Sequence, residues 1–159
     1  MSQELIDSYS GFIKATPQQV WEALTNPALT IQYPFGGAVE SDWRPGSDYV
    51  TKSADGASVM YDGKVLESEP PWRLVRSVHV KFSPAFTGHQ EMTIRWDVEQ
   101  FGETCKVTIS HRGHASDAQL FEMLTSHCPH LVSGLKTLLE TGQPLHIGQS
   151  ATATAQARE

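Results

Sequence analysis

Two pairs of histidines with three-residue spacing are the residues of this chain that could most directly do chemistry. The pairs are His111 with His114 and His127 with His130, and Cys128 directly follows His127. Imidazole and thiolate are ligands that zinc prefers, and residues three apart on a helix share a face, so a metal site is one interpretation. Histidines at the surface or at the rim of the core are the other. We expect no metal, because structural zinc usually prefers more cysteine than this chain offers, and we expect no cofactor.

Cys128 and Arg76 are two further candidates for chemistry. A neighbouring histidine lowers the pKa of a thiol, which would make Cys128 a nucleophile. The alternative is a small buried residue at the start of a helix, since free cysteine is among the residue types most often buried. Arg76 lies among apolar residues of an expected strand, where it would pair with a ligand carboxylate or phosphate in a cavity. Otherwise it reaches solvent or pairs with a carboxylate of the neighbouring strand.

Charge and motif content exclude several classes of protein. The 159 residues carry 12 Lys and Arg against 18 Asp and Glu, a formal net charge of −6, without a basic cluster. This balance argues against nucleic acid and anionic membrane surfaces as partners. The chain contains no nucleophile elbow, phosphate-binding loop, dinucleotide-binding fingerprint or paired Cys-x-x-Cys motif. Two cysteines, no apolar run of membrane-spanning length and no signal-peptide pattern predict a cytoplasmic protein without membrane insertion.

The elements that must position these residues occur in the order strand, short helices, many strands, long helix. Segments 4–14 and 38–111 are rich in β-branched and aromatic residues interrupted by turn residues. Segments 16–33 and 116–141 show helical spacing of apolar residues. The sequence therefore predicts an α+β protein, in which an antiparallel sheet with one buried face packs against a long C-terminal helix.

Local signals fix several boundaries of these elements. Thr16 followed by Pro17 and Gln19 predicts a capped helix start, and Asn26-Pro27 predicts a second short helix through about Tyr33. Pro129 divides the C-terminal helical region, and Gly142 ends its second part. We expect a single domain over 1–142, followed by a tail over 143–159 that has few bulky apolar residues.

Alternation of apolar and polar residues indicates which side chains face inward. It is clearest over 92–98 and 105–109, and it places Arg76 on the apolar face of a strand over 73–82. Four aromatic residues, which are Trp43, Tyr49, Tyr61 and Trp96, either line a pocket between sheet and helix or belong to the core.

Several short segments resemble one protein superfamily in the same order along the chain. They are residues 15–27, 43–47, 63–67, 70–75 and 131–142. From about residue 6 to 142 the sequence is similar to the SRPBCC superfamily. The closer likeness is to its AHSA-type branch, the homologues of the C-terminal domain of the activator of the ninety-kilodalton heat-shock protein ATPase.

This resemblance implies a helix-grip fold, in which a curved antiparallel sheet of six or seven strands wraps a long C-terminal helix, with two short helices after the first strand. It also implies a cavity between helix and sheet, where the superfamily often holds lipids, sterols or polyketides. Many AHSA-type sequences have a tryptophan where this chain has Cys128. We therefore expect the cavity to be enlarged beside Cys128, because a smaller side chain leaves volume unfilled.

The resulting hypothesis is a non-catalytic protein that binds a small, largely hydrophobic molecule between the last helix and the sheet. Arg76 and His111 would be the polar groups that orient the ligand. The residues expected to line the site are Tyr61, Arg76, Val78, Met92, Trp96, His111, Cys128, Leu131 and Leu135.

Two other functions are also compatible with the resemblance. One is an interaction module that stimulates a heat-shock-protein ATPase, and the other is an enzyme similar to polyketide cyclases or hydrolases. In an enzyme, His111 or His114 would act as acid or base, with Asp117 as the nearest carboxylate in sequence. A homodimer is a further expectation from the branch.

Overall fold

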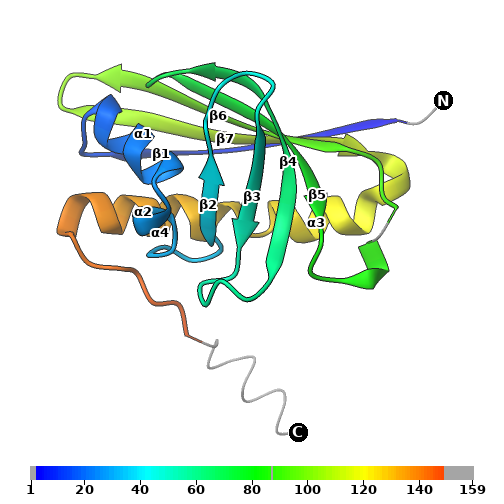
Figure 1. The fold of residues 1–159 in the computed structure, drawn as a ribbon. Helices are drawn as coiled ribbons and strands as arrows, with labels where there is room; N and C mark the ends of the chain where they lie inside the picture. The colour runs from blue at the N-terminus through cyan, green and yellow to red at the C-terminus, as the bar shows by residue number, and fades with distance from the viewer. Residues whose placement is uncertain (1–2, 87, 149–159) are drawn as a thin grey trace, which may run out of the picture.

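A computed structural model describes residues 3–86 and 88–148, and within them one antiparallel sheet packs against helices on its concave face (Figure 1). The seven strands follow the order β1-β7-β6-β5-β4-β3-β2 across the sheet. The strands are β1 (Glu4–Ile13), β2 (Ala38–Ser41), β3 (Asp48–Lys52), β4 (Val59–Glu69), β5 (Arg73–Val80), β6 (Met92–Phe101) and β7 (Thr104–His114). The α-helices are α1 (Pro17–Thr25), α2 (Pro27–Thr30), α3 (Ala118–Thr125) and α4 (Cys128–Thr141), and short 3₁₀ turns span Pro84–Phe86 and Ala115–Asp117.

The curvature of the sheet confirms the helix-grip prediction. Figure 1 shows β2 to β5 bending around α4, which runs beneath the strands β1, β6 and β7. Val132, Leu135 and Leu138 of α4 are buried in the main apolar core with residues of β1, β6 and β7. The long helix thus fills the concave side of the sheet, as the one-sided alternation predicts.

The predicted start of the first helix is confirmed in atomic detail. The Thr16 side chain accepts a hydrogen bond from the Gln19 amide, and the Gln19 side chain accepts one from the Thr16 amide. Asn26 caps α2 in a similar way through the Ala28 amide. The second helix is shorter than predicted and ends at Thr30 rather than near Tyr33.

The end of the chain also follows its local signals. Pro129 lies in the first turn of α4, so the C-terminal helical region is divided into α3 and α4 as predicted. Gly142 ends α4 with a φ of 75°, a conformation that glycine adopts without steric strain. Of the expected tail over 143–159, residues 149–159 lie outside the described part, and the domain boundary at 142 remains a prediction.

A close approach between α4 and the α2–β2 loop fixes one side of the interior. A Cβ atom on Gly134 would lie 2.5 Å from the Pro34 ring and 2.9 Å from Tyr33 Cβ, so only glycine lets the loop pack this tightly on the helix. This contact holds residues 33–36 beside α4. In the described residues, no helix combines the length and apolar character that crossing a bilayer requires.

Candidate functional site

A cavity of about 60 Å³ lies between the sheet and the helices. Each strand from β2 to β7 contributes to its wall, together with α1, the α2–β2 loop, α3 and the start of α4. Most of the lining is apolar or aromatic, and among the described wall residues none is Asp or Glu. The wall consists of Leu24, Tyr33, Phe35, Gly36, Val39, Tyr49, Thr51, Tyr61, Arg76, Val78, Ile94, Trp96, Ile109, Leu124, His127 and Leu131.

Five of the nine residues expected at the site lie in this wall. They are Tyr61, Arg76, Val78, Trp96 and Leu131. Leu131 comes from α4, and the other four come from strands along which inward positions alternate; Trp96 of β6 pairs directly with Ile109 of β7 and Leu74 of β5.

The other four expected residues are buried outside the cavity wall. Met92 packs in a second apolar cluster with Leu120 and Leu124, and Leu135 belongs to the main core. His111 and Cys128 face each other, with Cys128 Sγ 3.5 Å from His111 Nδ1. Contact of these four residues with a ligand remains a prediction, and it requires the cavity to extend.

The His111–Cys128 pair is deeply buried and neutral. Burial raises the pKa of the Cys128 thiol to about 12, with a further contribution from Asp7, and burial lowers the pKa of His111 to about 4. At neutral pH the pair is therefore a thiol beside an uncharged imidazole, which favours the buried-residue interpretation of Cys128 over the nucleophile. Cys128 is not among the described wall residues of this cavity, so the wall shows no enlargement beside it; its thiol lies against the His111 ring.

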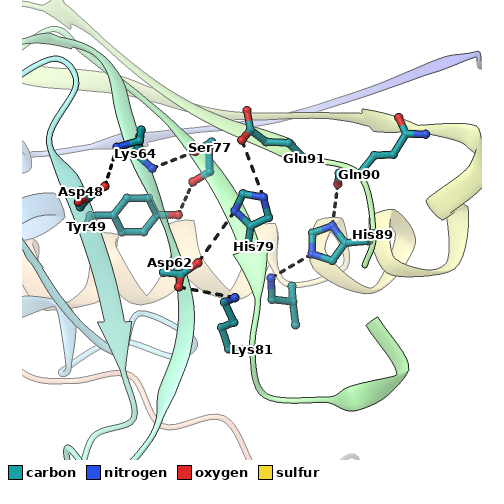
Figure 2. Close-up of polar contacts among 11 residues, drawn as sticks. Asp48, Tyr49, Asp62, Lys64, Ser77, His79, Lys81, His89, Gln90 and Glu91 are labelled. Carbon is teal, nitrogen blue, oxygen red and sulfur yellow. Dashed lines mark hydrogen bonds and ion pairs between the residues drawn. The ribbon is translucent and has the colours of Figure 1, made fainter. Parts of the chain in front are cut away.

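The hydroxyl groups of two wall tyrosines are already engaged with the backbone. Tyr49 donates to the Ser77 carbonyl at 2.6 Å (Figure 2), and Tyr33 donates to the Ala23 carbonyl at 2.9 Å. A Cβ atom on Gly63 would collide with the same Ser77 carbonyl, so glycine at this position leaves that oxygen room for Tyr49. Burial raises the pKa of Tyr49 to about 12. Both rings are thus neutral, fixed parts of the wall.

Phe35 lies between the cavity and the surface. It lines both the cavity and an outer groove formed with residues 144–147, and it is 51% exposed. Its ring stacks on His127, with centroids 3.9 Å apart and planes 4° apart, and it meets His130 edge-on at 5.4 Å. Its φ of 62° lies in the left-handed region, which is unfavourable for a bulky residue. Phe35 is therefore a strained residue at the boundary between the cavity and the surface.

The histidines of the two pairs lie in different environments. His111 faces the core, whereas His127 and His130 both pack against Phe35. No group of three or more potential metal ligands is found in residues 3–86 and 88–148.

A second group of charged side chains lies away from the cavity. In Figure 2, His79 of β5 lies between Asp62 and Glu91, with nitrogen–oxygen distances of 4.0 and 3.8 Å, and Asp62 also faces Lys81 at 3.8 Å. His79 alternates with the buried Val78, so it points to the outer face of the sheet. These partly exposed ion pairs contribute little to stability, and none of their residues lines the cavity.

Comparison with protein families decides where the chain belongs. The family model described as activator of Hsp90 ATPase homolog 1-like protein matches residues 14–140. The chain belongs to this family. The AHSA-type resemblance is thereby confirmed, and the matched range spans the elements that form the cavity, from α1 to α4.

Solved structures agree with the fold of this AHSA-type chain. CalU16 from Micromonospora echinospora has a TM-score of 0.69 and 15% identity, over 99% of this chain and 92% of that one. The Aha1 dimer from Colwellia psychrerythraea has a TM-score of 0.68 and 17% identity, over 87% and 98%. DynU16, from the dynemicin biosynthetic locus, has a TM-score of 0.71 and 23% identity, over 87% and 48%. A search of curated proteins gave no match.

Several wall residues were not among those predicted from the sequence. Ile94 and Ile109 obey the same alternation as Trp96, so that pattern was sufficient to find them. Phe35 and Gly36 lie in a loop without periodicity, and no sequence signal places them against the cavity.

Proposed function

We propose that this AHSA-type domain binds a small, largely apolar molecule in the cavity and does not act on it chemically. The observation that carries the proposal is an apolar cavity between sheet and helices whose only charged wall residue, among those described, is Arg76. Binding sites for small molecules combine such apolar walls with few polar groups that orient the ligand. The neutral His111–Cys128 pair outside the wall supports a non-catalytic role over the cyclase-like alternative.

The size of the cavity implies that the structure is the closed form of the site. An apolar cavity of about 150 Å³ binds a ligand such as benzene, whereas about 60 Å³ holds only a few water molecules. A ligand with even one ring therefore needs a wall residue to move. Phe35 is exposed, strained and held by a stacking contact, so it is the residue whose displacement joins the cavity to the outer groove.

We expect the neutral fluorescent probe N-phenyl-1-naphthylamine to bind with one-to-one stoichiometry, and Phe35→Ala to accelerate its binding about two- to tenfold. An aromatic stacking contact is worth about 0.5–1.5 kcal/mol, and the substitution removes this barrier to opening. Stopped-flow fluorescence measures the association rate, and titration measures the stoichiometry.

Phe101→Ala is the matched control. Phe101 is 49% exposed and meets Phe12 edge-on at 5.8 Å, but it is not a wall residue. Its substitution should leave the rate of probe binding unchanged. Failure of both this neutral probe and the anionic 1-naphthoate to bind the wild-type protein at any concentration would reject the proposed function, and equal acceleration by both substitutions would reject Phe35 as the point of access.

The family match supports a second candidate function, the stimulation of a heat-shock-protein ATPase. The family description names an activator of Hsp90 ATPase, and one solved structure with this fold is an Aha1 dimer. If the chain shares that role, adding it in stoichiometric amounts to an Hsp90 protein will raise the rate of ATP hydrolysis in a coupled assay. An unchanged rate would eliminate this candidate. A homodimer remains a prediction that light scattering of the same preparation tests.

A further inference from the structure

Arg76 is a cation that the fold directs into an apolar cavity. It lies on β5, the fourth strand from either edge of the sheet, where it pairs with Val65 of β4 and Ile94 of β6. Its inward neighbours on the same strand, Leu74 and Val78, are each 1% exposed. An apolar side chain at this position would complete the core, and it would avoid the free energy needed to remove a charge from water.

The guanidinium lacks an anionic partner among the described residues. Its Nε atom is buried and makes no hydrogen bond, and no described carboxylate lies within ion-pair distance of it. The guanidinium lies over the face of the Tyr49 ring, with Cζ 4.8 Å from the ring centroid. Such a contact offsets only part of the free energy of removing a charge from water.

Two of the three carboxylates of the neighbouring strand β4 face other cations. Asp62 faces Lys81 and His79 on the outer side of the sheet, and Glu67 lies 4.0 Å from Arg73. Since the third, Glu69, forms no ion pair with Arg76 either, the alternative that Arg76 pairs with a carboxylate of that strand does not hold among the described residues. Its charge therefore acts on the cavity without compensation. Burial raises the pKa of Tyr33, Tyr49 and Tyr61, and Arg76 opposes this rise; burial lowers the pKa of His111, and Arg76 lowers it further.

We infer that the ligand is a small organic carboxylate with an aromatic or aliphatic body, and that its carboxylate pairs with Arg76 through Nε. This inference rests on the proposed function, because it specifies the ligand class of the same cavity. A carboxylate accepts two parallel hydrogen bonds from the edge of a guanidinium, so it satisfies the orphaned Nε and the charge together. The apolar body then lies against the wall residues Trp96, Ile109 and Leu131.

A matched pair of probes separates the contribution of ligand charge to the affinity from that of apolar contact. 1-Naphthoate and 1-naphthamide share one ring system and differ in charge. The wild-type protein should bind the naphthoate at least about tenfold more tightly, because a hydrogen bond to a charged group exceeds a neutral one by about that factor. Arg76→Met, which keeps the length of the side chain, should remove this preference, and Arg76→Lys should retain part of it. Isothermal titration calorimetry measures the affinities.

Arg95→Met is the control, since Arg95 pairs with Asp97 on the other face of the sheet and its loss should not change the preference. Equal affinity of the wild-type protein for the two probes would overturn the inference, while binding of N-phenyl-1-naphthylamine would still support the cavity as a binding site. If none of the three probes binds, the proposed function itself fails.

The Arg76 variants are not the only test of the contact. Addition of naphthoate, but not naphthamide, should shift the Nε–Hε resonance of Arg76 in the ¹⁵N spectrum of the wild-type protein. An unchanged Arg76 resonance in the presence of saturating naphthoate would overturn the inference even if the Arg76→Met protein fails to fold.

Discussion

Trp96→Ala should lower the free energy of unfolding by about 3–5 kcal/mol, the usual cost of truncating a buried tryptophan. Trp96 is 3% exposed and lies in both the main core and the cavity wall. Its cross-strand partners Leu74 and Ile109 are also buried, so the backbone of three central strands cannot collapse into the space that the indole leaves. Urea unfolding followed by circular dichroism measures the loss.

Added indole should restore part of this stability, because a molecule that binds only the folded state stabilises it by mass action. The truncated site joins a cavity that already exists, so indole has both the space of the lost side chain and the original void. Trp72→Ala is the control: Trp72 is 45% exposed, and its loss should change stability by only about 0.5 kcal/mol without rescue by indole. Equal destabilisation by the two substitutions would contradict the assignment of Trp96 to the cavity wall.

The predictable part of the fold was local or periodic. Thr16 and Gln19 carry the capping box within four residues, and the alternation along β6 and β7 identifies the buried face without reference to any other segment. The end of α2 was wrong because a tertiary contact decides it. The Tyr33 hydroxyl bonds to the Ala23 carbonyl, which fixes residues 31–36 as a loop beside α4 rather than as a further helical turn.

The candidate site was predictable only where strands supply it. Alternation placed Arg76 and Trp96 inward, and the structure puts both in the cavity wall. His111 was expected to orient the ligand, but the sequence does not show that its ring packs against Cys128 instead of lining the cavity. Which inward residues surround a void depends on how α4 and the α2–β2 loop fill the concave face. Phe35 contributes to that filling from a loop, where sequence offers no periodicity.

His111 should make the stability of the protein depend on pH between about 6.5 and 4. Burial, followed by the charges of Arg76 and His127, lowers the pKa of folded His111 to about 4 from an ordinary value of 6.5. Below pH 6.5 the unfolded chain therefore takes up a proton that the folded chain does not. The contribution of His111 is complete above pH 6.5 and is lost as the pH falls towards 4, which amounts to about 3 kcal/mol.

Urea unfolding at a series of pH values tests this expectation. The informative quantity is the slope of the free energy of unfolding against pH, not its value at any one pH. His111→Asn places an amide near the position of Nδ1, beside Cys128, but cannot take up a proton. The variant should therefore lose the part of the decline between pH 6.5 and 4 that His111 contributes, whatever its stability at pH 7. His146→Gln is the control, because His146 is exposed and its loss should leave the slope unchanged. A slope that persists in His111→Asn would show that His111 is not held neutral by its burial beside Arg76, and that another group accounts for the acid sensitivity.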